Sequence, residues 1–208
     1  MKAKLIVLSL LAVIVLSTNV FSQGIKLSFG PEAGINIASF TGTPDPQSNS
    51  RTGLIVGANM EIGFNKYFSV QPGLRFVMKG SSASVTGGTI TDKLNYLEIP
   101  ALLKVNFALT EVNPYIMAGP VLAISLSANE DQTPTGGTTT TTDVSNNVSG
   151  TDFCMMFGGG VGFKVTHKVD LYVQVGYSLG LSNILKNTTT ATLKNNGIQI
   201  TAGAMFGL

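Results

Sequence analysis

Six charged side chains lie singly among apolar residues, and they are the first candidates for chemistry in this sequence. Three are carboxylates and three are cations: Glu32, Glu61, Glu98, Arg75, Lys104 and Lys164. If the fold gathers them in one enclosed space they must pair, because a lone buried charge loses hydration that nothing replaces. The simplest interpretation is a lattice of ion pairs with a structural role. A path for protons or ions is the functional alternative.

Residue types that are typical of catalysis are scarce. His167, the single histidine, lies in "VTHKVD", which we expect to be a short solvated turn, so neither a serine–histidine–carboxylate triad nor a zinc cluster is indicated. Cys154, the single cysteine, is expected to point inwards as a small core residue. The run "GGGVGF" has no lysine at the spacing of a phosphate-binding loop. We therefore expect no enzyme activity, no cofactor and no metal.

The N-terminus predicts export. Two lysines precede an apolar run from Leu5 to Leu16, and Ser22 occupies the small-residue position before a cleavage site, as in a secretory signal peptide. The run is shorter than the roughly 20 residues of a membrane-spanning helix. We therefore expect residues 1–22 to be a cleaved signal peptide and residues 23–208 to form one domain.

The composition indicates the surroundings of that domain. The chain has 13 Lys and Arg against 11 Asp and Glu, and the two lysines of the leader account for the excess. A near-neutral remainder argues against nucleic acid as a partner. Only 12% of the residues are charged, which is about half of the usual share for soluble domains. An exported, weakly charged chain without a long apolar helix suggests strands that are partly covered by lipid.

The stretch "NYLEIPALLKVNFA" carries the clearest strand pattern. Read two residues at a time, it places Leu97, Ile99, Leu103 and Val105 on one side, and Glu98 and Lys104 on the other. Similar alternation predicts seven further strands, at about 27–38, 54–64, 68–79, 114–127, 153–165, 171–181 and 198–208.

The predicted connections alternate in length. Short ones fall near 65–66, 109–113 and 166–169, and long polar ones near 40–51, 80–92, 128–151 and 182–195. This pattern predicts an all-β fold, an eight-stranded antiparallel up-and-down transmembrane β-barrel with both termini in the periplasm.

Two interiors are possible for such a barrel. A soluble lipocalin-like barrel would fill its interior with the apolar set. A membrane barrel would turn that set to lipid and enclose the six charges, together with Gln71, Gln174 and Tyr172. We favour the membrane barrel, although Pro31, Pro72, Pro100 and Pro120 lie inside predicted strands, where they would mark bulges or the ends of hydrogen-bonded ladders.

Several motifs carry a family resemblance. "LNYLEIPALLKVNF", "FSVQPGLRFVMKG", "NPYIMAGPVLAISLS", "GGGVGFKV" and "DLYVQVGYSLGLSNI" together resemble the PorT-like outer-membrane β-barrel family of Gram-negative bacteria. The resemblance implies an eight-stranded barrel in the outer membrane, in a family most of whose members have no assigned activity. The chain departs from the usual terminal aromatic residue, because it ends in Phe206-Gly207-Leu208.

We expect a non-enzymatic monomer with a structural, surface-binding or envelope-complex anchoring role. Its expected partners are outer-membrane lipid and an envelope or extracellular protein, bound through long loops such as the threonine-rich segment 129–152 and the segment 187–196. The first alternative is a narrow channel or gated pore for small solutes or ions. The second is a soluble periplasmic ligand-binding barrel, which would need the inside and outside to be exchanged.

Overall fold

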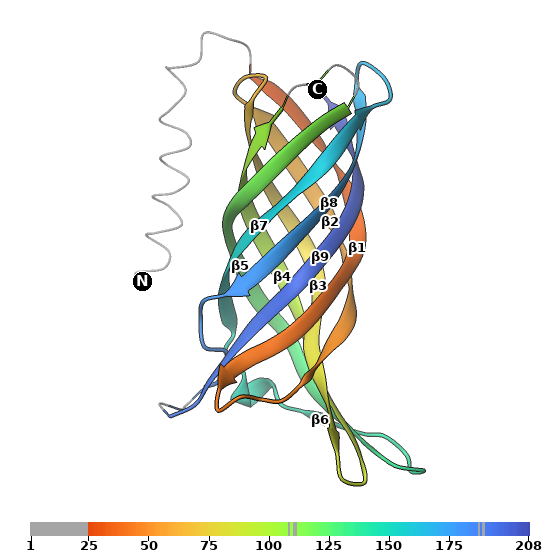
Figure 1. Cartoon of the computed structure of the whole chain (residues 1–208), viewed down its shortest axis with the longest axis vertical. Helices are drawn as coiled ribbons and strands as arrows, with labels where there is room; N and C mark the ends of the chain where they lie inside the picture. The colour runs from red at the N-terminus through yellow and green to blue at the C-terminus, as the bar shows by residue number, and fades with distance from the viewer. Residues whose placement is uncertain (1–24, 108, 110–111, 187, 189) are drawn as a thin grey trace.

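The chain forms a closed ring of tilted antiparallel strands (Figure 1). The computed structural model describes residues 25–107, 109, 112–186, 188 and 190–208, so the expected signal peptide lies outside the described residues. The ring strands are β1 (Lys26–Thr43), β2 (Asn49–Gly63), β3 (Phe68–Val85), β4 (Gly88–Asn106), β5 (Val112–Pro134), β7 (Thr151–Lys164), β8 (Val169–Gly180) and β9 (Thr192–Gly207). Each strand pairs with its neighbours in chain order, and the pairing of β1 with β9 closes the ring. In the part of the chain so described, no helix is both long and apolar enough to cross a membrane.

The ring is polar inside and apolar outside. In β4, Glu98 and Lys104 are 0% and 5% exposed, whereas their neighbours Ile99 and Leu103 are 41% and 51% exposed. Large apolar side chains are likewise exposed on all of the remaining ring strands. The eight-stranded up-and-down barrel is therefore confirmed. The alternative of a soluble barrel with an apolar interior is wrong.

Short turns connect the strands at the end of the barrel that carries the C-terminus, which we call the short-turn end (Figure 1). Between β2 and β3, the side-chain oxygen of Asn65 accepts hydrogen bonds from the backbone N–H groups of Tyr67 and Phe68, at 2.8 and 2.9 Å. Between β7 and β8, Thr166 Oγ1 accepts one from the N–H of Lys168 at 3.2 Å. Such side-chain acceptors fix tight turns locally.

The opposite, long-loop end differs from the prediction. The expected loop at 80–92 is instead a hairpin, because β3 runs to Val85, β4 starts at Gly88, and Gly87 supplies the positive φ of the turn (+91°). The expected loop at 128–151 holds the end of β5 and the short strand β6 (Thr140–Asp143), followed by the 3₁₀ turn η2 (Ser145–Asn147). We call segments 80–93 and 129–143 the outer extension. Apolar alternation stops there, while backbone pairing continues between threonine-rich strands, which have high β-propensity.

The four prolines leave the strand register unchanged. Pro72 pairs in register with β4 but has no ladder partner on β2. Pro100 likewise pairs in register with β5 but has no ladder partner on β3. Register shifts lie elsewhere, between Ser50 and Ile55 and between Asn95 and Tyr96. A proline lacks an N–H donor, so it interrupts one ladder without inserting an extra residue.

Two glycines make room for tyrosine rings inside the ring. A Cβ atom on Gly160 would lie 2.5 Å from Tyr115 Oη, and one on Gly203 would lie 2.5 Å from Tyr172 Oη. The glycine-rich β7 therefore permits close side-chain approach in a narrow lumen, as its sequence predicted.

Candidate functional site in the barrel lumen

Four charged side chains meet in the middle of the lumen, and we call them the central cluster. Glu98 of β4 accepts from Arg75 Nε at 3.0 Å and from Arg75 Nη2 at 2.8 Å, and it pairs with Lys79 Nζ at 2.7 Å. Glu32 of β1 lies 3.8 Å from Arg75 Nη1. All four side chains are at most 3% exposed. Two carboxylates and two cations balance, so each buried charge has an opposite neighbour.

Hydrogen bonds across the lumen surround the central cluster. Tyr172 of β8 donates to Glu32 Oε2 at 3.4 Å, and Asn59 of β2 donates to the Tyr172 hydroxyl at 2.9 Å. Asn36 of β1 donates to the carbonyl of Met78 in β3 at 3.0 Å. These bonds join strands that are not neighbours in the ring, and so they fill its cross-section.

A second ion pair lies towards the short-turn end. Lys104 Nζ is 2.6 Å from Glu61 Oε2, and Ser69 Oγ donates to Glu61 Oε1 at 2.8 Å. The Lys104 ammonium also lies 3.9 Å from the centre of the Tyr115 ring, and the Tyr115 hydroxyl donates to Gln174 at 3.0 Å. The Glu61 side chain is 21% exposed, so this pair keeps some contact with water.

A third polar group lies towards the long-loop end, around the buried carboxylate of Asp152. It accepts from Ser182 Oγ at 2.5 Å, from Asn195 Nδ2 at 2.9 Å and from the thiol of Cys154 at 3.6 Å. Asn195 Nδ2 also donates to the Tyr96 hydroxyl at 3.2 Å. Cys154 is thus a buried neighbour of a fully bonded carboxylate, in line with its expected inward position.

The long-loop mouth of the lumen is closed by apolar side chains. Val148 and Ile184 come from two different loops, which are joined by hydrogen bonds from Ser149 N to Ile184 O (2.7 Å) and from Lys186 N to Asn147 O (3.0 Å). They pack with strand residues into one buried cluster, the apolar plug: Phe40, Leu94, Tyr96, Ala123, Ala128, Val148 and Ile184.

The outer extension carries its own charges beyond the plug. Lys93 of β4 pairs with Asp131 of β5, and Thr141 Oγ1 donates to Asp131 at 2.8 Å. The hydrogen bond from Lys93, followed by that from Thr141, lowers the pKa of Asp131 from its ordinary value of 3.8. On the other face, Asp92 lies opposite Glu130, and burial, followed by the Glu130 charge, raises the pKa of Asp92.

The structure brings together five of the six predicted lumenal charges. Glu32, Arg75 and Glu98 lie in the central cluster, and Glu61 and Lys104 form the second pair. Lys164 is more exposed than these five, although it lines a small cavity together with Glu61 and Lys104. It has the inward parity of β7 but is the last residue of that strand, so it lies exposed at the mouth of the barrel.

Sequence reasoning missed two buried charged residues of the lumen. Lys79 shares its strand face with Arg75, a signal that was available, but it lies at the predicted end of its strand. Asp152 lay in a segment that the sequence assigned to a loop, whereas it is the second residue of β7 and 1% exposed.

Catalytic and metal-binding groupings are sparse in the described part of the chain. His167 is exposed in the turn between β7 and β8, outside the central cluster. Within the described ranges, no group of three or more His, Cys, Asp or Glu side chains could hold a metal ion.

Comparisons with known proteins agree with this geometry. A family described as "Outer membrane protein beta-barrel domain" matches residues 21–186, whereas no curated protein matches significantly. Neisserial surface protein A (NspA) is 16% identical, with a TM-score of 0.54 over 88% of this chain and 99% of that chain. Outer membrane protein OprG from Pseudomonas aeruginosa is 10% identical, with a TM-score of 0.50 over 88% of this chain and 95% of that chain.

At such low identity these neighbours show the fold alone, and the narrower PorT-like resemblance stays a prediction. The family match covers most of the chain, and the inverted burial of the strands is that of a membrane barrel. The chain therefore belongs to the outer membrane protein beta-barrel domain family and is a transmembrane β-barrel of the bacterial outer membrane.

Proposed function

We propose that this protein is a plugged, non-conducting barrel with a non-enzymatic role, which holds the outer extension at the cell surface for binding or for anchoring an envelope complex. The observation that carries the proposal is the filling of the lumen. The central cluster occupies its middle with four buried charges, and the apolar plug closes its long-loop mouth. Eight strands enclose an interior that side chains can fill completely.

The outer wall supports lipid as the surrounding partner. Ile99, Leu103, Val173 and Val175 are each between 41% and 51% exposed, at the level of the buried charges. Such a surface in water would be a large aggregation liability, whereas lipid covers it at no cost. Outer-membrane barrels keep tight turns in the periplasm and longer connections outside, so we assign the short-turn end to the periplasm.

The outer extension supports a role in binding at the surface. The four residues of β6 are all exposed and three of them are threonines. β6 pairs with β5 through Asn129–Gln132, and β5 pairs with β4, so the extension is an ordered sheet rather than a mobile loop. A rigid polar sheet held above the membrane presents hydrogen-bonding groups at little entropic cost to a partner. The expected partner is an envelope or extracellular protein.

A narrow channel is the second candidate. Its support is a small lumenal cavity of about 90 Å³ at the periplasmic end, which Glu61 and Lys104 line. That cavity would form only the periplasmic part of a conducting path, because the central cluster and the apolar plug still lie between it and the long-loop end.

Conductance in planar bilayers separates the two candidates. The wild-type protein and the Arg75→Ala variant should both lack steady single-channel steps, although Arg75→Ala should unfold at lower denaturant concentration. A gated pore would instead conduct more when Arg75 is removed from the lumen. Steady steps in either protein would refute the plugged barrel.

Surface binding has a separate test. A photo-crosslinking residue at Thr142, in the outer extension, should capture envelope or extracellular protein on intact cells. The matched control is the same residue at Thr166, in the β7–β8 turn. Equal capture from both positions, or none from Thr142, would count against the outer extension as the binding surface.

A further inference from the structure

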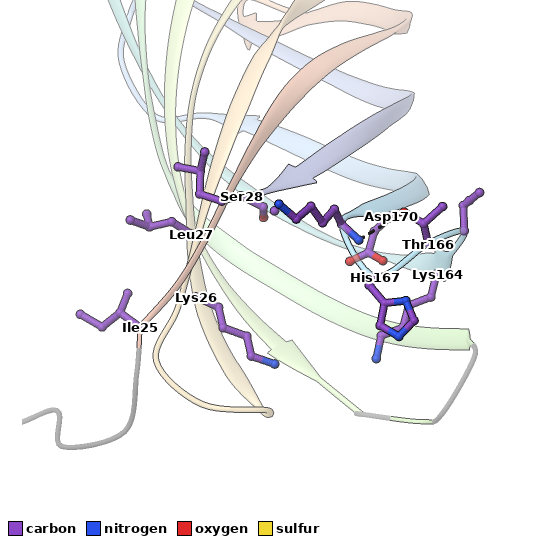
Figure 2. Close-up of a pocket in the computed structure, with 12 residues that line it drawn as sticks. Ile25, Lys26, Leu27, Ser28, Lys164, Thr166, His167 and Asp170 are labelled. Atoms are coloured by element: carbon purple, nitrogen blue, oxygen red, sulfur yellow. Dashed lines mark hydrogen bonds between the residues drawn. The ribbon is translucent and has the colours of Figure 1, made fainter.

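The periplasmic mouth of the barrel is hollow. The hollow has a volume of about 800 Å³ and lies between the start of β1, the β7–β8 turn and the end of β9. Figure 2 shows Lys26 pointing from β1 towards the side of the turn, while its neighbours Ile25 and Leu27 point the other way. Volumes of this order are typical of small-molecule sites.

The charge of this hollow is not balanced. Its lining residues include three lysines, Lys26, Lys164 and Lys168, together with His167, against one acidic side chain, that of Asp170. Lys164 and Asp170 lie opposite each other in register on β7 and β8. With the histidine neutral, the lining side chains carry a net charge of +2, and the α-carboxylate of Leu208, which also lines the hollow, lowers the total to +1. This excess sets the mouth apart from the central cluster, where the charges balance.

The hollow continues into the lumen. The smaller cavity of about 90 Å³ shares Ser28, Lys164 and Asp170 with it, so the two are contiguous. Glu61 and Lys104 line the smaller cavity but already neutralise each other at 2.6 Å.

Gln71 supplies an independent sign of a ligand. It lines the smaller cavity and is 2% exposed, yet its Oε1 atom has no hydrogen-bond partner among the described residues. A buried acceptor without a donor costs stability, so a bound group that donates a hydrogen bond would stabilise this position.

Two glycines line the mouth at positions that are not crowded. Cβ atoms added at Gly162 and Gly207 would find their nearest neighbours at 3.7 and 3.8 Å. These distances contrast with 2.5 Å at Gly160 and Gly203, deeper in the lumen, where tyrosine rings fill the space.

We propose that the periplasmic mouth binds a phosphate monoester whose alcohol part carries a hydroxyl group. The phosphate, with a charge of about −1.5 to −2 and three acceptor oxygens, is opposite in sign to the net charge of the lysine-lined hollow. The hydroxyl donates to Gln71 Oε1 in the smaller cavity. The same chemistry has two sources, a free small phosphate ester from the periplasm and a phosphomonoester lipid of the inner leaflet. This site lies on the periplasmic side of the central cluster and the apolar plug, and apart from the outer extension, so its failure would leave the proposed function intact.

Calorimetric titration of the full-length mature protein in detergent micelles tests the site, with glycerol phosphate and inorganic phosphate as probes. Both should bind saturably. The double variant Lys26→Gln/Lys164→Gln should bind each at least about tenfold more weakly, since it removes two charge-assisted contacts. Gln71→Met, which preserves side-chain volume, should weaken glycerol phosphate about threefold to tenfold and leave inorganic phosphate unchanged.

The matched control is Lys66→Gln. It removes one positive charge at the same end of the barrel, but Lys66 lies over the Tyr67 ring and does not line the hollow. Its affinity for both probes should stay within about twofold of wild type. Heat-dependent gel mobility establishes that each variant is folded before it is titrated.

A measurement in lipid nanodiscs distinguishes a free phosphate ester from a phosphomonoester lipid as the ligand. The protein in nanodiscs with lysophosphatidic acid, whose glycerol keeps one free hydroxyl, should bind glycerol phosphate more weakly than in nanodiscs without it if the lipid occupies the site, and equally if the ligand is free. Either result supports the phosphate monoester. The proposal is overturned if neither glycerol phosphate nor lysophosphatidic acid binds saturably, or if Lys66→Gln weakens binding as much as the double variant does.

Discussion

Removing the carboxylate of Glu98 should destabilise the barrel more than any other single charge removal in the lumen. Glu98 is fully buried and shared by two cations, Arg75 at 2.8 Å and Lys79 at 2.7 Å. In Glu98→Gln, Arg75 keeps Glu32 at 3.8 Å, whereas the 3%-exposed Lys79 side chain loses the carboxylate that it pairs with. Breaking a buried pair on one side costs about 3–5 kcal/mol, and we expect that loss here.

The assay is equilibrium urea unfolding from phospholipid vesicles, followed by far-ultraviolet circular dichroism because the chain has no tryptophan. Two variants calibrate the result. Glu61→Gln should cost about 1–3 kcal/mol, since its side chain is 21% exposed and water can replace part of the interaction. The double variant Glu98→Gln/Lys79→Met should unfold with a free energy at least about 1 kcal/mol higher than that of Glu98→Gln, because it no longer contains the buried, unpaired ammonium group of Lys79. A loss for Glu98→Gln no larger than that for Glu61→Gln would refute the reasoning.

Three further predictions concern the lumen, the wall and the outer extension. Gly203→Ala should cost at least about 1–3 kcal/mol of unfolding free energy, because its added Cβ would lie 2.5 Å from both the Pro31 carbonyl oxygen and the Tyr172 hydroxyl, while Gly150→Ala, with nothing within 4 Å of its added Cβ, should be nearly neutral. Ile99→Lys should cost about 2–4 kcal/mol in vesicles if the wall faces hydrocarbon, and an unchanged midpoint would contradict lipid contact. The Asp131 carboxyl should titrate below 3.8 in carbon-detected NMR and rise in Thr141→Val. Because that pKa is lowered on folding, its stabilising contribution is present above the unfolded value and lost as the pH falls through the folded one. An Asp131 midpoint at or above 3.8 would contradict the observed hydrogen bonds.

The faces of the strands could be predicted from the sequence because the side-chain period of a strand is two. In β4, the charges at Glu98 and Lys104 required an enclosed polar interior, and the large residues between them required an apolar exterior. That argument holds only in the part of the barrel that lipid surrounds. In the outer extension both faces of the strands are polar, so the apolar alternation could not predict that β3 continues to Val85 and β5 to Pro134.

The composition of the lumen was harder to predict than its polarity. Lys164 and Lys79 have the same inward parity, but one lies at the mouth and is exposed while the other is 2% exposed. The difference depends on how far along the barrel axis each residue lies. That position can be predicted only when the actual ends of the strands are known. Val148 and Ile184 lie in polar segments, and their packing depends on two loops meeting across the mouth, a contact that local sequence does not encode.

The hydrogen bonds that cross the lumen have a consequence for assembly. Asn59 with Tyr172, and Tyr96 with Asn195, join strands on different sides of the ring. They cannot form in a partly built sheet, however well its neighbouring strands are paired. These bonds therefore form only in the final step, when β1 meets β9, which should make closure of the ring cooperative. The same coupling acts in reverse, because opening the seam would release these contacts together, and the lifetime of the folded barrel is set by that single event.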